Sequence, residues 1–220
     1  MNNKNKQFAI IGLGRFGSSI ATTLFNLGYE VLAIDMDEEQ VQKSSELVTH
    51  VIQADTTDEN TLKALGIRNF DVVVVAIGED IQANVLTTLL LKDLGVKYIV
   101  AKARNELHGK MLAKIGADRV VYPERDMGLR VAHSLVATNV LEYIELSPDL
   151  SVAEITTPKI LIGKSLVEAN LRAKYEINVV AIKREEVLII PPPPDEKIQA
   201  GDILIFVGKT KGIQNMEELE

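Results

Sequence analysis

The segment that most constrains the fold is a glycine-rich stretch at residues 12–17. It follows the apolar run 8–11, which predicts a buried strand, and leads into residues whose apolar positions recur with helical spacing. In this strand–turn–helix context, the pattern Gly-x-Gly-x-x-Gly is typical of nucleotide-binding folds, and it predicts a phosphate at the helix N-terminus. The residues of the stretch are Gly12, Leu13, Gly14, Arg15, Phe16 and Gly17.

An acidic residue lies at a suitable distance beyond this stretch. Asp35 ends the apolar run 31–34, about 18 residues after Gly17, where a carboxylate can hold ribose hydroxyls and disfavours a 2′-phosphate. Arg15 can reach a third phosphate or a phosphate on a neighbouring chain. The alternatives are a glycine-rich turn with a surface acid and no ligand, and a solvent-facing arginine.

Short apolar runs at 31–34, 48–52, 72–77, 98–101 and 119–122 alternate with amphipathic stretches. This rhythm predicts βαβ units and a Rossmann-type, doubly wound parallel sheet. Such sheets bind ligands at the carboxyl ends of their strands. Taken singly, the residues at these ends are equally consistent with ordinary loop chemistry. Those that we assign to the site are Met36, Asp55, Thr56, Ala76, Ile77, Gly78 and Lys102.

The pattern changes in the second half of the chain. Residues from about 125 to 141 predict a helix that is apolar almost all round, covered either by a second copy of the chain or by its own sheet. Beyond residue 147, short strands (152–155, 177–182, 187–190, 203–207), one helix (166–170) and four prolines (191–194) predict a small α+β domain. We therefore expect a Rossmann domain at 1–124, a linking helix at 125–145 and a C-terminal domain at 146–213.

Several function classes are disfavoured by composition and motifs. The net charge of −7 disfavours broad nucleic-acid binding, and the absence of cysteine excludes disulfides and thiolate metal sites. We expect neither a signal peptide at residues 1–6 nor a membrane span. His50, His108 and His133 follow no catalytic or metal-ligand spacing, so we interpret them as partly exposed structural residues.

These absences favour a protein that is not an enzyme and that uses its nucleotide as a signal or structural ligand. Two alternatives remain open from the residues. One is an NAD(H)-dependent oxidoreductase or redox sensor, because the glycine-rich stretch and Asp35 suit NAD equally well. The other is a module that binds no ligand and serves only assembly.

Several segments together resemble the RCK (KTN) family of cytoplasmic regulatory subunits of Ktr/Trk potassium-uptake systems, closest to the Ktr subunits of Gram-positive bacteria. The resemblance covers almost the whole chain. It is carried by residues 11–17, Asp35, 66–71, 115–118, 123–127, 163–166, 171–175 and 199–204.

The resemblance implies a homodimer that assembles into an octameric ring and docks on an integral-membrane potassium channel subunit at the inner face of the membrane. It implies ATP or ADP in the Rossmann domain, with NAD(H) as a further ligand. Arg15 would then meet the terminal phosphates and Asp35 the ribose, while Asp55 and Thr56 would lie beside the adenine. Glu124 would lie near the phosphates at the dimer interface, where a divalent cation bridges.

The resemblance also implies that the C-terminal RCK domain binds cyclic di-AMP between two copies. An arginine for phosphate and aliphatic side chains for adenine suit this ligand chemically. The sequence departs from the family at Glu176, where many relatives have glycine, and in its four consecutive prolines; a plain dimer core is the alternative. The matching positions are Leu166, Leu171, Arg172, Ala173, Asn178 and Val179.

Overall fold

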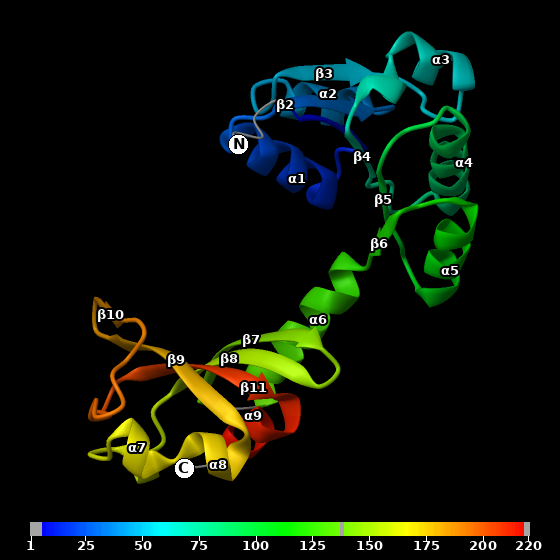
Figure 1. Ribbon diagram of the computed structural model, residues 1–220. Helices are drawn as coiled ribbons and strands as arrows, with labels where there is room; N and C mark the ends of the chain where they lie inside the picture. The colour runs from blue at the N-terminus through cyan, green and yellow to red at the C-terminus, as the bar shows by residue number, and fades with distance from the viewer. Residues whose placement is uncertain (1–5, 137–138, 218–220) are drawn as a thin grey trace. The chain divides into compact units, whose positions relative to one another are not determined.

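The computed structural model describes residues 6–136 and 139–217 of the chain. By its internal contacts, the chain divides into two compact units, Met1–Glu124 and Arg125–Glu220. Each unit has its own sheet (Figure 1). Each also has its own buried apolar core.

The first unit has a six-stranded parallel sheet in the order β3-β2-β1-β4-β5-β6. This order confirms the predicted doubly wound sheet, because the chain turns outward in opposite directions from β1 and from β4. The strands are β1 (Gln7–Ile11), β2 (Glu30–Asp35), β3 (His50–Gln53), β4 (Val72–Val75), β5 (Ile99–Lys102) and β6 (Arg119–Val121). The helices are α1 (Arg15–Asn26), α2 (Glu38–Ser44), α3 (Glu59–Ala64), the 3₁₀ turn η1 (Ile67–Asn69), α4 (Ile81–Asp93) and α5 (Glu106–Ile115).

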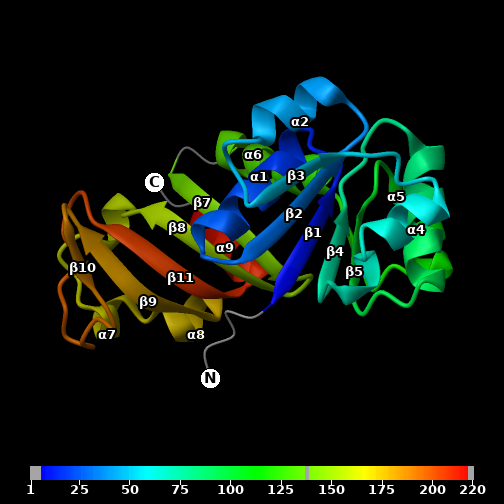
Figure 2. The same ribbon diagram turned by 90° about the horizontal axis from the view of Figure 1, so that it is seen from above.

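Helices cover both faces of this sheet, as Figure 2 shows for α1 on one side and α4 and α5 on the other. Alternate residues of a strand point to opposite faces. Ile11 of β1 therefore belongs to the cluster that includes Leu91 of α4 and Leu112 of α5, while Ile10 packs in a second cluster with Ala21 of α1. These fully buried side chains hold the strands and helices of the unit together.

Local signals fix where most of these helices begin. Asp37, Asp58, Asp80 and Asn105 precede α2, α3, α4 and α5, and the side chain of each accepts a hydrogen bond from a backbone N–H of the first turn. Such caps satisfy donors that have no partner within the helix. In the same unit α5 ends at Gly116, whose φ of +117° suits glycine.

The second unit has a five-stranded antiparallel sheet in the order β10-β9-β11-β8-β7, which confirms the predicted small α+β domain. Its core includes the fully buried residues Ile155, Ile177 and Phe206. The strands are β7 (Val140–Ser147), β8 (Leu150–Thr156), β9 (Ile177–Arg184), β10 (Val187–Ile189) and β11 (Ile203–Lys209). The helices are η2 (Lys159–Leu161), α7 (Leu166–Ala169), α8 (Leu171–Tyr175) and α9 (Thr210–Glu217), and α6 (Pro123–Val136) leads into the unit.

The prediction of a linking helix at 125–145 is wrong at the C-terminal end of that range. The described part of α6 ends at Val136, residues 137 and 138 lie outside the described ranges, and Val140 begins β7. The register of β7 against β8 shifts between Val140 and Glu142, so buried Val140 and Tyr143 stand three residues apart. That spacing is helical, and it hides the strand from a periodicity argument.

Two short helices were also missed. The helix predicted at 166–170 is two helices, α7 and α8, separated at Asn170, whose φ of 50° is left-handed. The C-terminal domain predicted to end at residue 213 continues through α9, whose Ile213 and Met216 are fully buried. α9 begins directly after β11, with no loop signal between them.

Arg184 at the end of β9 joins several parts of the second unit. Its guanidinium donates two hydrogen bonds to Asp202, from Nε at 2.9 Å and from Nη2 at 3.0 Å, and a third to Glu196 at 2.9 Å. Nη2 also donates to the carbonyl oxygen of Lys197, and Asp202 accepts from the backbone N–H of Gln199. This clamp holds the proline-rich loop before β11 against β9.

The clamp sets the ionisation of Asp202. Burial raises the pKa of this carboxyl, but the hydrogen bonds from Arg184 and from the backbone of Gln199 outweigh that effect and hold its pKa below the usual range. A lowered native pKa stabilises the fold above the carboxyl's unfolded pKa, and this contribution disappears as the pH falls through the native value.

We expect Asp202→Asn to destabilise the protein by about 2 kcal/mol, because it leaves the Arg184 guanidinium with half of its bidentate partner. The loss should shrink as the pH falls below the unfolded pKa of an aspartate, about 4, because the contribution of the carboxylate in the parent declines from there down to its lower native pKa. Urea unfolding of the full chain at several pH values measures both effects. The control is Glu176→Gln, which removes a pair with Lys209 between two exposed side chains and should have little effect. Equal losses in the two variants would contradict the clamp.

Candidate functional site

The candidate site lies at the carboxyl edge of the parallel sheet, between β1 and β4. This is the point at which the strand order reverses, and doubly wound folds open a crevice there. The glycine-rich stretch leaves β1 at this edge and is tied to both neighbouring strands. The N–H of Gly12 donates to Ile34 of β2 at 2.8 Å, and the N–H of Ala76, after β4, donates to Ile11 at 2.7 Å.

The three glycines of the stretch have different surroundings. Gly12 has a φ of +91°, and a Cβ there would lie 2.9 Å from the backbone nitrogen of Ile77. A Cβ on Gly17 would lie 1.8 Å from the carbonyl oxygen of Gly12. A Cβ on Gly14 would meet nothing within 4 Å. The first and third glycines are therefore required by the fold, whereas the space beside Gly14 is open to a ligand.

The N-terminus of α1 faces this open space without a cap. Gly14 is its N-cap residue and has no side chain to offer, and the first turn of α1 contains no acidic residue. The other four helices of the unit are capped by Asp or Asn. The N–H groups of the first turn of α1 and their partial positive charge are thus available to an anion.

Asp35 stands directly beside the glycine-rich stretch. Its Oδ2 accepts a hydrogen bond of 2.6 Å from the backbone N–H of Leu13, and its Oδ1 accepts one of 2.9 Å from Asp37. These bonds orient the carboxylate between β1 and β2. The next residue, Met36, is exposed. A half-buried carboxylate in this place can accept hydrogen bonds from the hydroxyls of a ribose.

Asp55 and Thr56 lie beyond β3 in a tight turn. Asp55 accepts hydrogen bonds from the backbone N–H and the hydroxyl of Thr57. Thr56 is buried, and its hydroxyl pairs with that of Thr87 on α4 at 3.0 Å. The carbonyl oxygen of Thr56 also accepts a hydrogen bond of 3.3 Å from Thr87. The side chain and the carbonyl of Thr56 are therefore occupied within the protein, and its backbone N–H is the part available to a ligand.

Lys102 ends β5 on the same edge. Its side chain is only 12% exposed, its Nζ pairs with Glu124 at 2.5 Å, and it lies 5.8 Å from the centroid of the Phe16 ring. A Cβ on Gly78 would lie 3.0 Å from Nζ, so the absence of a side chain at Gly78 leaves room for the ammonium. The hydrogen bond from Lys102 holds the pKa of the Glu124 carboxyl below its usual range.

Asn84 on α4 is a residue of this edge that sequence analysis missed. It is fully buried, and its Nδ2 donates to the carbonyl oxygens of Ile77 at 2.6 Å and Lys102 at 3.1 Å. It therefore joins the ends of β4 and β5. Its Oδ1 has no hydrogen-bond partner among the described residues. The sequence signal that could have revealed Asn84 is a polar residue between the apolar positions of a predicted helix.

Arg15 is exposed in the first turn of α1. Its guanidinium has no ion pair or hydrogen bond within residues 6–136 and 139–217. This observation agrees with both alternatives for Arg15, a phosphate ligand and a solvent-facing side chain.

The histidines differ from the expectation of partly exposed residues. His108 is buried, which lowers the pKa of its imidazole, and its Nδ1 accepts a hydrogen bond of 3.3 Å from the backbone N–H of Arg104. His50 lies on edge strand β3 and is exposed. The side chain of His133 lies outside the described part of the chain. Within that part, no group of three His, Asp or Glu side chains could hold a metal ion.

The residues assigned to cyclic di-AMP lie along α7, α8 and the start of β9. Arg172, Ala173 and Asn178 are exposed, and Leu166 and Val179 are half-buried against the core. Leu171 is itself a core residue with 4% exposure, as the plain-core alternative expects. Glu176 has a left-handed φ of 57°, which explains why glycine suits this position.

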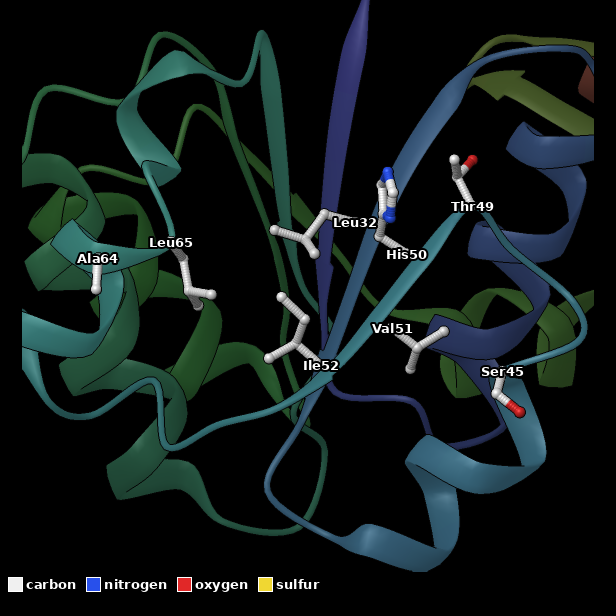
Figure 3. A pocket seen from close by; sticks show the side chains of 8 residues that line it. All are labelled: Leu32, Ser45, Thr49, His50, Val51, Ile52, Ala64 and Leu65. Carbon is white, nitrogen blue, oxygen red and sulfur yellow. The ribbon is translucent and has the colours of Figure 1, made fainter.

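A separate hollow of about 600 Å³ opens along edge strand β3 (Figure 3). Side chains of β2, β3 and α3 line it, among them Leu32, His50, Ile52 and Ala64. It contains none of the residues assigned to the nucleotide.

Comparison with known proteins gave matches in both units. Residues 8–123 match the TrkA-N domain family and residues 150–220 the TrkA-C domain family. The chain is 51% identical, over 97% of its length and 96% of the relative's, to Ktr system potassium uptake protein C of Bacillus subtilis (strain 168). None of the helices within the described residues has the length and apolar character of a membrane span.

Two solved structures of GsuK are similar in fold. The GsuK channel bound to NAD has a TM-score of 0.68 at 18% identity, over 100% of this chain and 40% of that chain. GsuK bound to ADP has a TM-score of 0.51 at 27% identity, over 62% of this chain and 35% of that chain. Both likenesses agree with the arrangement of strands and helices described above.

We expect Gly14→Ala and Gly17→Ala to differ sharply in stability. The methyl group at Gly14 enters open space, so the melting temperature should hardly change, whereas the methyl group at Gly17 forces α1 away from β1 and should destabilise the protein by about 3 kcal/mol. Thermal unfolding followed by circular dichroism measures both. Equal melting temperatures for the two variants would show that α1 does not pack on the Gly12 carbonyl.

Proposed function

Because this chain belongs to the TrkA-N/TrkA-C family of Ktr and Trk potassium-uptake proteins, we propose that it is a gating subunit switched by two ligands. It binds ATP or ADP at the β1–β4 edge of the first unit and cyclic di-AMP on the second. The observation that carries this proposal is the open space beside Gly14, faced by the uncapped N-terminus of α1. It performs no chemistry on its ligands.

The residues around Gly14 suit an adenine nucleotide. The N–H groups of α1 and the ammonium of Lys102 are donors for the phosphates, and the Asp35 carboxylate is an acceptor for the ribose hydroxyls. We assign the adenine to the end of the site at Met36, Asp55 and the backbone N–H of Thr56. The GsuK relative that has ADP bound is 27% identical to this chain, and it supports the same ligand class here.

A second candidate function is binding of NAD(H) by a redox sensor. The glycine-rich stretch and Asp35 suit NAD as well as ADP, and the GsuK structure with NAD has the same fold. An oxidoreductase is less well supported, because His108 is buried and His50 stands on edge strand β3. A substrate-dependent change in nicotinamide absorbance would favour the enzyme.

Gating follows from differential binding. A ligand that fits one shape of the assembly better than another shifts the population toward that shape. We propose that the assembly is an octameric ring of dimers that docks on a membrane potassium channel subunit at the cytoplasmic face. The apolar side chains Met127, Leu129 and Leu135 of α6 are exposed. This exposure supports the proposal that a second copy of the chain covers α6.

A divalent cation is proposed only together with the nucleotide. Glu124 is a single carboxylate and is paired with Lys102, and one ligand is too few for such an ion. The phosphates would have to supply further oxygen ligands. The described residues of one chain do not form a cation site by themselves, so no step of the proposal depends on the ion.

We expect Arg15→Ala to reduce the preference for ATP over ADP. If the guanidinium contacts a third phosphate, its loss weakens the affinity for ATP by about tenfold and leaves the affinity for ADP nearly unchanged. Isothermal titration with each nucleotide, with and without Mg²⁺, measures the ratio. The control Lys43→Ala removes an exposed cation that is paired with Glu39 on α2. An unchanged ratio in Arg15→Ala would contradict this role of Arg15.

We expect Arg172→Ala to abolish stabilisation by cyclic di-AMP and to retain stabilisation by ADP. The exposed guanidinium supplies the positive charge for the phosphates of the second ligand. A thermal-shift panel with ATP, ADP, NAD, NADH and cyclic di-AMP tests this. The control Lys174→Ala removes a neighbouring exposed cation of α8. Stabilisation of the parent by NADH alone would overturn the proposed function in favour of the redox sensor.

A further inference from the structure

Lys102 and Glu124 join the candidate site to the beginning of α6. Lys102 ends β5 at the edge of the crevice, and Glu124 is the second residue of α6. We infer that a phosphate group bound at this edge displaces Glu124 from Lys102. The ammonium then pairs with Glu124 of α6 when the site is empty and with the phosphate when the ligand is bound. This inference rests on the proposed nucleotide site and names how that site acts on the rest of the chain.

The ammonium is held in a fixed place near the glycine-rich stretch. The hydrogen bond from Asn84 to the backbone oxygen of Lys102 ties the end of β5 to α4, and Gly78 leaves room for Nζ. The ring of Phe16, two residues beyond Gly14, lies 5.8 Å from Nζ. An anion held by the N–H groups of α1 would therefore lie close to the same ammonium.

The two partners differ in their need for the ion pair. The side chain of Lys102 is 12% exposed, while that of Glu124 is 71% exposed. A largely buried ammonium requires a counter-ion, whereas an exposed carboxylate is well solvated on its own. Exchange of Glu124 for a phosphate oxygen therefore leaves the lysine neutralised and returns the carboxylate to water. Adenosine has no phosphate and would leave the pair intact.

The exchange changes what holds the first turn of α6. With the pair formed, Glu124 fastens this turn to the end of β5; with a phosphate on Lys102, that fastening is gone. α6 continues from Pro123 to Val136, into the second unit. Phosphate binding in the first unit thus reaches the helix that connects the two units through one side-chain contact.

The test compares the affinity for ADP of the full-length variant Glu124→Gln with that of the parent. The affinities are measured by isothermal titration in a buffer with a chelator that removes divalent cations. Because the carboxylate no longer competes for Lys102, we expect ADP to bind about threefold to tenfold more tightly than to the parent. The matched control is Glu106→Gln on α5, which removes the same charge from an exposed residue that forms no ion pair within the described ranges. Equal or weaker binding by Glu124→Gln, relative to this control, would overturn the inference.

A second measurement on the unaltered protein is independent of the variant's stability. Hydrogen exchange of the backbone N–H groups of residues 127–130, the first that can bond to carbonyls within α6, should become faster when ADP is saturating and should not change with adenosine. Unchanged exchange with bound ADP would overturn the inference while leaving the proposed function intact. Failure of the parent to bind ATP, ADP or NAD would overturn both.

Discussion

The close approach of α1 to β1 is the contact on which the rest of the first unit depends. Gly17 stands so near the carbonyl oxygen of Gly12 that no side chain fits between them, and a Cβ on Gly12 would in turn lie 2.9 Å from the backbone of Ile77, after β4. This packing brings the start of α1 to the carboxyl ends of β1 and β4, from which the chain leaves in opposite directions. The helix N-terminus, the Asp35 carboxylate and the Lys102 ammonium then meet at one edge, although they come from different parts of the chain.

Most of the first unit could be predicted because its signals are local. Each buried strand is a short apolar run, and four of its helices begin at an Asp or Asn whose side chain caps the first turn. In the second unit the signals are weaker. The bulge between Val140 and Glu142 gives a strand a helical spacing, and α9 follows β11 without a break. Errors in the prediction of the second unit fall at these two places and at Asn170, which separates α7 from α8.

The sequence singles out individual residues of the candidate site but does not predict the contacts between them. Sequence spacing and family resemblance single out Lys102 and Glu124 separately. Their ion pair joins residues 22 positions apart and depends on the parallel pairing of β5 with β6. Asn84 stayed hidden for the same reason, since its partners are backbone oxygens at the ends of two strands. Long-range polar contacts of this kind follow from the fold and have no local sequence pattern.

The charges at the β1–β4 edge show how an acidic chain can attract an anion. The formal net charge is −7, yet this edge combines the N-terminus of α1 with a lysine whose side chain is almost buried. Low exposure strengthens the attraction of that ammonium for an anion, because little water screens it. Asp35 at the other end repels an anion and accepts hydroxyl groups. The proposed ligand, with hydroxyls at one end and phosphate at the other, has the matching polarity, which is that of a nucleotide. Glu124, already paired with Lys102, is the intramolecular anion that a phosphate would replace under our inference.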